Sequence, residues 1–402
     1  MDFSIVLFDD IASRDHLLPL VATRPISDLR VGALTIGQKW QLISKQDVSY
    51  LTVDYLQSKF PLDPLQSTIL LIHGSLLPSQ ELINILLHED FYSNVINEQA
   101  ELIAVKIHKK DLSTYACKCK TRLDDGHHVS GLKRVIYPED IFKFNAAEIS
   151  IDIASLKLTK ANKGFWKNVL FFGDDVYIDE SVVIDQAVID SRLGPVMIAK
   201  DVIIESGVTI KGPVSINQGS RVKTGAVLYT NVTVGPNCTI NGEINNVVIW
   251  GNSAKGHEGY LGCAVVGQGC NLGGGTTNSN LKNDWTNVKL YDYCDEEYRD
   301  TAILKCGVII GDQVMLGINT KITTGTVIGV GAQVAMSKFI PKFVPDFSWI
   351  TDDKMEPYVL EKFIQMVQRK AKVKSEKITE EDLLVFKNIY NNTQKLRSYN
   401  QH

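Results

Sequence analysis

The residues best suited to chemistry lie between Ser253 and Asp284, in the stretch SAKGHEGYLGCAVVGQGCNLGGGTTNSNLKND. This stretch combines a lysine, a histidine, a tyrosine, several asparagines and three consecutive glycines. Histidine side chains have an ordinary pKa of about 6.5 and are suited to remove a proton at neutral pH, and His257 is the histidine of this stretch. The glycines at 273–275 let a ligand approach backbone N–H groups closely. The stretch therefore predicts an acid–base site; the alternative is a structural histidine at a corner of the chain.

A second group with chemical potential is a set of cations near the start of the chain. Four of them fall within about 25 residues: Arg14, Arg24, Arg30 and Lys39. Such side chains bind phosphate through charge-assisted hydrogen bonds, so we expect a phosphate-binding segment, with a solvated charged face as the alternative. Cys117 and Cys119 could hold a metal, but no second ligand pair has suitable spacing, and a plain strand is favoured.

Both groups need regular structure to position them, and the C-terminal half contains a six-residue repeat. Aliphatic residues recur at every sixth position from 198 to 240, and a second small or apolar set keeps the same step from 202 to 244. The step resumes from Leu304 to Val334. This period is typical of a parallel β-helix, and neither a helix nor an alternating strand has it.

The repeat is interrupted between Ile244 and Leu304, where the chemically active stretch lies. From 280 to 300 the chain leaves the repeat in a long loop, and such loops commonly carry binding sites. Trp285, Tyr291 and Tyr293 in this loop could cover a ligand. We therefore expect the site at this interruption.

The flanking segments predict an α/β domain before the β-helix and helices after it. FSIVLFDD and STILLIHGSLLPS are typical of buried parallel strands, and ELINILLHE of a helix. Residues 355–374 and 379–397 have helical spacing, and the second segment begins with a Thr379–Asp382 capping pattern. The predicted domains are residues 1–165, 166–350 and 351–402.

Composition limits the classes of function. The net charge of -4 provides no basic field for nucleic acid or an acidic membrane. No apolar segment reaches membrane-spanning length, and the acidic opening MDFSIVLFDD differs from a secretion signal. Seven scattered cysteines are typical of reduced thiols. We therefore expect a cytoplasmic protein that binds neither nucleic acid nor a membrane.

The interrupted stretch resembles the acetyltransferase half of a bifunctional family, the N-acetylglucosamine-1-phosphate uridylyltransferases/glucosamine-1-phosphate acetyltransferases. KGHEGYLGCAVVGQGCNLGGGTTNSN is similar to that family's G-H, Y-L-G-D-A and N-I-G-A-G-T elements, and the likeness extends over roughly residues 175–340. The resemblance implies a left-handed β-helix, a homotrimer, and acetyl-CoA as co-substrate.

The same resemblance implies roles for individual residues. His257 would be the general base that deprotonates a sugar amine as the amine attacks a thioester. The implied sugar-phosphate contacts are Lys255, Tyr260, Asn271, Asn280, Arg221 and Lys223. The implied acetyl-CoA contacts are Gly274, Ile318, Met336 and Lys338.

Three positions depart from the family pattern. Asn245 stands where the family has a lysine that binds the sugar phosphate, so Arg221 or Lys223 would have to replace it. Cys263 replaces the aspartate of Y-L-G-D-A, and Leu281 replaces a tyrosine. The sugar pocket is therefore expected to differ in detail from that of the family.

Over nearly its whole length the chain also resembles a Bacteroidetes-type branch of sugar nucleotidyltransferases. The elements LFDD, LLPL, TRP and LTI…KW within residues 7–40 carry this likeness. It implies an α/β nucleotidyltransferase-like, Rossmann-like domain that uses Mg²⁺. The implied nucleotide-binding residues are Arg14, Arg24, Arg30, Lys39, Asp140 and Asn145.

Two features of such enzymes are missing from this part of the chain. The segment FDDIASRDHLLPLVATRP has no glycine, although a glycine-rich phosphate loop is usual there. Gly74 stands where the family has a magnesium-binding aspartate, so the metal ligand is unknown and Asp9 or Asp10 could replace it.

The sequence therefore predicts a two-part transferase. Acetyl-CoA would acetylate glucosamine 1-phosphate, and a nucleotidyl group, most plausibly from UTP, would then be joined to the sugar phosphate to give UDP-N-acetylglucosamine. Two alternatives stay open. Only one half is catalytic, as a nucleotidyltransferase with a structural β-helix or an acetyltransferase with a vestigial first domain; or the chain is a non-catalytic scaffold that binds sugar nucleotides.

Overall fold

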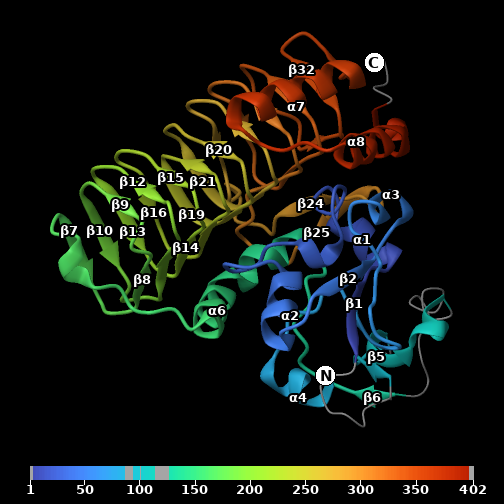
Figure 1. Ribbon diagram of the computed structural model, residues 1–402. Helices are drawn as coiled ribbons and strands as arrows, with labels where there is room; N and C mark the ends of the chain where they lie inside the picture. Colours follow the sequence, from blue (N-terminus) through green and yellow to red (C-terminus); the bar gives the residue numbers. More distant parts are fainter. Residues whose placement is uncertain (1–2, 87–93, 100, 114–125, 398–402) are drawn as a thin grey trace. The chain divides into compact units, whose positions relative to one another are not determined.

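The computed structural model describes residues 3–86, 94–99, 101–113 and 126–397 (Figure 1). It divides into two compact units. Unit 1 comprises Met1–Leu17, Thr23–Leu29 and Leu34–Tyr137, and unit 2 comprises Leu18–Ala22, Arg30–Ala33 and Pro138–His402. Cys117 and Cys119 lie outside the described residues. Within those residues, no helix combines the length and apolar character needed to cross a membrane. The domain limits given above stay predictions.

Unit 1 is an α/β fold on a six-stranded mixed sheet with the order β2-β1-β3-β5-β4-β6. The strands are β1 (Ser4–Phe8), β2 (Val48–Leu51), β3 (Thr68–His73), β4 (Val95–Ile96), β5 (Leu102–His108) and β6 (His127–His128). The helices are α1 (Ile11–Leu17), η1 (Ile26–Asp28), α2 (Ile36–Ser44), α3 (Asp54–Gln57), α4 (Gln80–Leu86) and η2 (Lys109–Asp111). The predicted parallel strands β1 and β3 are confirmed, and β5 runs antiparallel to β3.

The core of unit 1 follows from the apolar character of β1 and β3. Val6, Phe8, Ile69 and Leu71 are all fully buried. Continuous apolar strands of this kind are covered on both faces, as the centre of an α/β sheet requires. The side chains after these strands therefore leave the core together, at the carboxyl edge of the sheet.

Unit 2 is a parallel β-helix, as predicted, in which short strands stack into three faces (Figure 1). The first face stacks β8 (Val176–Ile178), β11 (Val196–Ile198), β14 (Val214–Ile216), β17 (Val232–Val234), β19 (Glu243–Ile249), β21 (Tyr260–Val266), β26 (Val308–Ile310), β29 (Thr326–Ile328) and β31 (Phe343–Val344). The second face stacks β9 (Val183–Ile184), β12 (Ile203–Ile204), β15 (Arg221–Val222), β18 (Thr239–Ile240), β20 (Ala254–Lys255), β22 (Asn271–Leu272), β27 (Met315–Leu316), β30 (Gln333–Ala335) and β32 (Ser348–Thr351). The third face stacks β7 (Val169–Phe172), β10 (Ala187–Asp190), β13 (Val208–Lys211), β16 (Val227–Leu228), the first halves of β19 and β21, and the pair β23 (Thr277–Asn278) and β28 (Lys321–Ile322).

The six-residue step is confirmed by burial. The repeat positions from Ile204 to Ile240 are fully buried, and Ile198 is 1% exposed. The resumption at Leu304 is wrong, because Leu304 is 46% exposed and the neighbouring Lys305 still bridges to Leu281 in the loop. The inward step resumes one period later, at Ile310, which is fully buried.

The loop at 280–300 forms a hairpin of β24 (Lys289–Asp292) and β25 (Glu297–Asp300). Tyr291 stacks on Phe343 with ring centroids 3.7 Å apart, and Tyr293 is buried against the same ring. The expectation that three aromatic residues cover a ligand is therefore wrong for these two tyrosines. Trp285 remains exposed.

Helices and short segments complete unit 2. They are α6 (Pro138–Leu156), η3 (Lys163–Phe165), β33 (Met355–Pro357), α7 (Leu360–Lys374), α8 (Glu380–Asn392) and η4 (Gln394–Arg397). The predicted cap of α8 is confirmed, since the Thr379 hydroxyl accepts from the Asp382 N–H and the Asp382 side chain accepts from the Thr379 N–H. Asn145 of α6 accepts hydrogen bonds from Gly32 N–H (2.8 Å) and the Thr233 hydroxyl (2.9 Å), so it fastens this helix to the β-helix.

Candidate functional site

His257 lies on an outer corner of the β-helix, in the turn between β20 and β21. Its side chain is exposed. A Cβ atom added to Gly274, in the next turn along the stack, would lie 3.7 Å from Cβ and Cγ of His257. The imidazole is thus open to solvent and rests beside the glycine segment, as a base that must meet a substrate requires.

Three of the four residues expected to contact acetyl-CoA continue this corner. Each residue of the corner stands two positions after an inward-facing residue of the second face; they are His257, Gly274, Ile318 and Met336. The inward-facing residues pair in register along β20, β22, β27 and β30. Stacked strands lie about 4.8 Å apart, so the four residues span roughly 14 Å. We call this column the His257 edge. Ile318 is 75% exposed on it, and Lys338 is exposed two residues beyond Met336.

Lys223 and Lys255 donate to the backbone of the His257 turn. The Lys255 ammonium donates to the carbonyl oxygens of His257 (2.5 Å) and Glu258 (2.9 Å), and the Lys223 ammonium donates to that of Gly256 (2.9 Å). Burial, partly offset by the charge of Glu258, lowers the pKa of Lys255 to about 8. Phosphate contacts by these two lysines stay a prediction, and the backbone contacts weigh against it.

Tyr260 and Asn280 are brought together on the third face. The Asn280 side-chain amide donates to Tyr260 Oη at 3.0 Å and lies 3.4 Å from Cys263 Sγ. A Cβ on Gly262 would lie 2.2 Å from Tyr260 Oη, so the phenol needs a glycine there to reach Asn280. The Asn246 amide also donates to Cys263 Sγ, at 3.3 Å. Cys263, which replaces the family aspartate, thus acts as the acceptor at the centre of this cluster.

Asn271 and Arg221 share an outward column of the second face, separated by the paired residues Thr239 and Ala254. Arg221 is 54% exposed, and its Nε lies 2.5 Å from Glu205 Oε1. At about 4.8 Å for each strand step, Arg221 is roughly 14 Å from Asn271 along the stack. A single small sugar phosphate would hardly contact both.

An open pocket of about 450 Å³ begins beside Asn280. Its lining comprises Ser279, Leu281, Lys282, Asn283, Asp284, Thr323, Thr324, Phe339 and Lys342. Ser279 and Thr324 are joined by a hydroxyl–hydroxyl hydrogen bond of 2.8 Å across the two strands. The volume of this pocket falls within the range of small-molecule sites. Sequence reasoning missed this pocket, because its walls come from two segments about forty residues apart.

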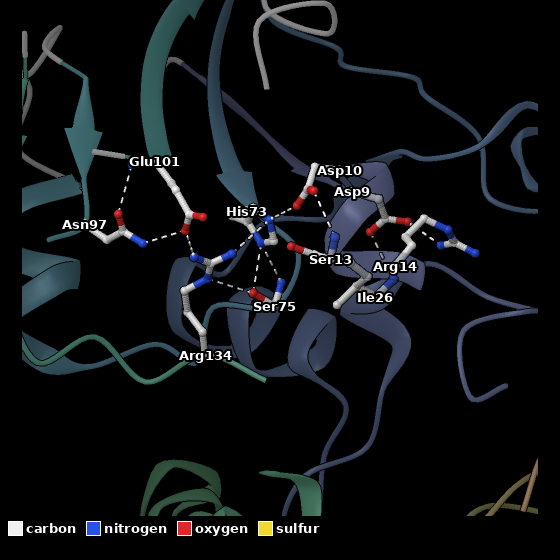
Figure 2. A network of polar contacts seen from close by, with 10 residues as sticks. All are labelled: Asp9, Asp10, Ser13, Arg14, Ile26, His73, Ser75, Asn97, Glu101 and Arg134. Atoms are coloured by element: carbon white, nitrogen blue, oxygen red, sulfur yellow. Dashed lines mark hydrogen bonds and ion pairs between the residues drawn. The ribbon is translucent and has the colours of Figure 1, made fainter. Parts of the chain in front are cut away.

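The candidate site of unit 1 is a polar network at the carboxyl ends of β1 and β3 (Figure 2). β2 and β3 lie on opposite sides of β1. The strand order therefore reverses between β1 and β3, and open α/β sheets usually bind ligands at such a topological switch point. His73 ends β3, and its Nε2 lies 2.7 Å from Oδ2 of Asp10, which follows β1. The network therefore occupies the expected binding edge.

The hydrogen bonds around His73 define its protonation state. The Ser75 backbone N–H donates to His73 Nδ1 at 3.2 Å, so this nitrogen carries no proton and Nε2–H donates to Asp10. Burial and the nearby Arg134 guanidinium lower the pKa of His73. Burial acts to raise the pKa of Asp10, but hydrogen bonds from His73 and Ser13 outweigh it, and the net pKa is well below the usual value. The result is a neutral imidazole beside an ionised carboxylate.

Arg134 extends this network away from the strands. Its Nε donates to the Ser75 hydroxyl at 3.0 Å and its Nη1 donates to Glu101 at 2.7 Å, while the Asn97 amide also donates to Glu101 at 2.7 Å (Figure 2). The sequence analysis singled out none of these residues. The only signal was the polar sequence HGS at the end of a buried strand.

Arg14, expected to bind nucleotide, forms a buried ion pair with Asp9 at 2.6 Å. The side chains are 4% and 2% exposed. Asp9 also accepts from the Thr52 hydroxyl at 2.6 Å and from the Ile26 N–H at 3.0 Å. Both oxygens of this carboxylate are thus engaged inside unit 1, which favours a structural role for the pair.

The other residues predicted to bind nucleotide are divided between the units. In unit 1, Arg24 pairs with Asp28 at 3.3 Å, and Lys39 is only 3% exposed. In unit 2, Arg30 donates to the Ala33 carbonyl, Asp140 pairs with Lys143 at 3.3 Å, and Asn145 is fully buried. The burial of Asn145 weighs against a place at the edge of a nucleotide pocket.

Comparison with known sequences finds a match to a protein family in the N-terminal part. Residues 5–161 match the sugar nucleotidyl transferase family. This span is fewer than half of the 402 residues, and it contains the network of Figure 2 and all the residues predicted to bind nucleotide.

Curated relatives carry the name "Bifunctional protein GlmU". The protein of Methanococcus aeolicus is 30% identical over 131 residues, which are 31% of this chain and 29% of the relative. That of Methanococcus vannielii is 27% identical over 228 residues, which are 51% of this chain and 54% of the relative. The chain thus spans between about a third and about half of the length of these relatives.

Among solved structures, the UDP-N-acetylglucosamine acyltransferase of Francisella novicida is similar to 59% of this chain and is itself 99% covered. The identity is 14% and the TM-score is 0.31. At these values the likeness adds nothing to the fold described above.

Proposed function

We propose that this chain is a two-part sugar-phosphate transferase. Unit 2 transfers an acetyl group from acetyl-CoA to the amine of glucosamine 1-phosphate. Unit 1 then joins the acetylated sugar 1-phosphate to a nucleotidyl group from UTP, which gives UDP-N-acetylglucosamine and pyrophosphate. The relatives named bifunctional GlmU and the match of residues 5–161 support the two-part assignment.

The observation that carries the acetyl-transfer part is the His257 edge. It combines an exposed imidazole, a glycine that leaves the backbone accessible, and an outward column long enough to support an extended thioester arm. Tyr260 and Asn280 add polar groups on the adjacent face. Acetyl transfer to an amine needs a base, a surface that positions the thioester, and contacts that position the sugar.

The reaction follows from these parts. The sugar amine attacks the thioester carbonyl carbon in its neutral form, after one proton of the ammonium has passed to solvent, and His257 accepts a second proton from the attacking nitrogen. The new C–N bond forms, the C–S bond breaks, and the imidazolium returns the proton to the leaving thiolate. A backbone N–H near Gly274 stabilises the carbonyl oxygen as its negative charge develops. Tyr260 and Asn280 orient the sugar, and Asn271 is left out because it lies roughly 14 Å along the stack from Arg221.

Ile318, Met336 and Lys338 complete the acetyl-CoA contacts in this proposal. The first two line the His257 edge beside the pantetheine arm, and Lys338 meets the phosphates. Arg221 is the sugar-phosphate contact, because Lys223 and Lys255 donate to backbone carbonyls.

The nucleotidyl-transfer part is supported by the family match and by the polar network at the β1–β3 edge. Mg²⁺ is predicted from the resemblance, but the described residues at this edge do not fit a dedicated magnesium site. Asp9 has both oxygens engaged, Gly74 has no side chain, and Asp10 is held by His73 and Ser13. We therefore derive no step through the metal.

A second candidate is an acetyltransferase whose unit 1 transfers no nucleotidyl group. The observation that favours it is the internal pairing of Arg14 with Asp9 and of Arg24 with Asp28. Two cations expected to meet a triphosphate are thereby neutralised within unit 1. A ligand would have to displace these contacts, which is costly for the buried pair.

We propose a cytoplasmic homotrimer as the working form. The first rungs of the β-helix expose large apolar side chains, including Leu170, Val183, Leu193 and Ile203. Val183 and Ile203 are register partners, so their exposed side chains adjoin on one face, and a contiguous apolar patch commonly marks an interface. Light scattering on the purified chain tests the assembly, and a monomer in dilute solution contradicts it.

Two coupled assays test the function on the full chain. Acetyl-CoA with glucosamine 1-phosphate should release a free thiol, and UTP with N-acetylglucosamine 1-phosphate should release pyrophosphate. Thiol release alone supports the second candidate, and pyrophosphate release alone leaves the β-helix structural. If neither product forms, with galactosamine 1-phosphate and TTP also tried, the chain is a binding scaffold.

A further inference from the structure

The second face of the β-helix has one charged residue in its interior column. The inward residues pair in register along the stack, and they are Ile184, Ile204, Val222, Ile240, Lys255, Leu272, Leu316, Val334 and Ile350. Eight are aliphatic, and the ninth is Lys255, which is 1% exposed. This column continues through the segment where the six-residue step is lost in the sequence.

A lysine at this position is unfavourable for the fold itself. Taking an ammonium group out of water carries a large desolvation penalty, and an apolar side chain of similar volume is commonly neutral or stabilising in its place. The penalty is visible here, because burial lowers the pKa of Lys255 to about 8. Packing alone therefore does not explain the residue.

The ammonium group instead acts on the turn that carries His257. Lys255 donates to the carbonyls of His257 and Glu258, and Lys223 donates to that of Gly256. Three consecutive carbonyl groups of one turn thus accept hydrogen bonds from lysine side chains. When these carbonyls are fixed, the peptide planes on both sides of His257 are fixed, and so is the direction of its side chain.

We propose that Lys255 is a positioning residue, which holds the His257 turn so that the imidazole stays beside Gly274. This inference rests on the proposed acetyl transfer, and it assigns Lys255 to the geometry of the base rather than to the substrate phosphate. Lys223 assists from two rungs away. The two hydrogen bonds that Lys255 donates to this turn explain why a charged residue stands in an otherwise aliphatic column.

The substitution Lys255→Met separates a role in stability from a role in positioning His257. Methionine makes the inward column fully apolar but cannot donate hydrogen bonds to the turn. We expect the variant to melt at the same or a higher temperature than the natural chain. We expect kcat for acetyl transfer to fall by about 10²-fold, the typical effect of a misplaced catalytic group. KM for both substrates should stay unchanged. Ile240→Met is the matched control, one rung away, and should leave kcat unchanged.

Two kinetic results overturn the proposal. One is an unchanged kcat in Lys255→Met. The other is a raised KM for glucosamine 1-phosphate at unchanged kcat, which makes Lys255 a phosphate contact. If Lys255→Met does not fold, Lys223→Met serves instead. Lys223 is only partly buried and contributes one of the three contacts, so kcat should fall several-fold at constant KM.

A spectroscopic measurement keeps this inference separate from the proposed function. The His257 imidazole resonances can be assigned by their loss in His257→Gln. We expect them to shift and broaden in Lys255→Met but not in Ile240→Met. If the natural chain transfers no acetyl group, the proposed function fails, and these resonances still decide the matter. Identical His257 resonances in the natural chain, in Lys255→Met and in Ile240→Met overturn the positioning role.

Discussion

The two candidate sites place their histidines in opposite environments. His257 is exposed on a corner of the β-helix, whereas His73 is 2% exposed and held at both ring nitrogens. An exposed imidazole can meet a ligand without rearrangement. A buried imidazole with its lone pair already accepting a hydrogen bond instead keeps its neighbours in place. The difference indicates a site ready for proton transfer in unit 2 and a fixed polar network in unit 1.

The cations of the two sites behave alike despite this difference. Lys255 is bound to backbone carbonyls, and Arg14 is bound to Asp9, so neither charge is open to solvent. Burial of a charge is tolerated only where it is fully paired. The comparison teaches that lysine and arginine near a candidate site can shape the site from within without contacting the substrate.

The largest effect is expected from removing the exposed base. His257→Ala should lower the rate of acetyl transfer by about 10²–10⁴-fold, because it removes the group proposed to accept the proton of the attacking amine. Thiol release under saturating substrates measures it. His128→Ala, at an exposed histidine of unit 1, is the control and should leave the rate unchanged. Normal acetylation by His257→Ala would remove this residue from the mechanism.

The next effect is on the stability of unit 1. Arg14→Ala leaves the Asp9 carboxylate buried without its cation, and breaking such a pair is destabilising by about 3–5 kcal/mol. Hydrogen exchange of the β1 amides, followed by mass spectrometry, should speed up accordingly.

The matched control is Arg192→Ala, which breaks an exposed pair with Asp190. It should leave exchange in β10 almost unchanged. Loss of nucleotidyl transfer in Arg14→Ala with normal β1 exchange would contradict the structural role and make Arg14 a ligand contact.

The sequence predicted the His257 site better than the network of unit 1, and the reason is physical. A β-helix repeats every six residues, so counting along the chain gives spatial neighbours, and Ile318 and Met336, eighteen residues apart, fall on one corner. His257 and Gly274 are seventeen residues apart, so they come from the family resemblance and not from counting. In unit 1, Arg134 meets His73 although sixty-one positions separate them. Loop contacts of this kind have no periodic signal.

The same argument explains one error in unit 2 and one residue whose burial the sequence did not indicate. Leu304 matched the six-residue count but lies in the loop, because counting does not detect where the chain rejoins the stack. The resemblance implies a sugar-phosphate contact for Lys255, which stays a prediction, and lysine is rarely buried. Its inward direction follows only from its pairing with the rung of Ile240, which the interruption hides.

A smaller effect is expected from acid on the unit 1 network. The pKa of His73 is lowered in the folded chain from 6.5. The unfolded chain therefore binds a proton at a higher pH than the folded chain does, and unit 1 should lose stability as the pH falls below 6.5. A single group changes stability by at most about 1.4 kcal/mol per pH unit.

Hydrogen exchange of β3 at several pH values, referred to the intrinsic rate, measures this loss. Asp10, Asp9 and Arg134 are the charged groups around His73, and Asp10 contributes in the same direction only at more acid pH, because its pKa is lowered from 3.8. In His73→Asn the pH dependence between 6.5 and 5 should disappear. An identical slope in both chains would show that His73 does not titrate as the network requires.

The smallest effect concerns the sugar contacts beside the His257 edge. Tyr260→Phe removes the acceptor of the 3.0 Å hydrogen bond from Asn280 but keeps the ring that lies over Gly262. A neutral hydrogen bond is worth about 0.5–1.5 kcal/mol, so KM for glucosamine 1-phosphate should rise roughly 2- to 10-fold with little change in kcat. Tyr298→Phe, at an exposed tyrosine of the hairpin, is the control. A loss of kcat as large as that of His257→Ala would mean that the phenol, and not only the imidazole, takes part in proton transfer. Tyr260 would then be a catalytic residue rather than a sugar contact.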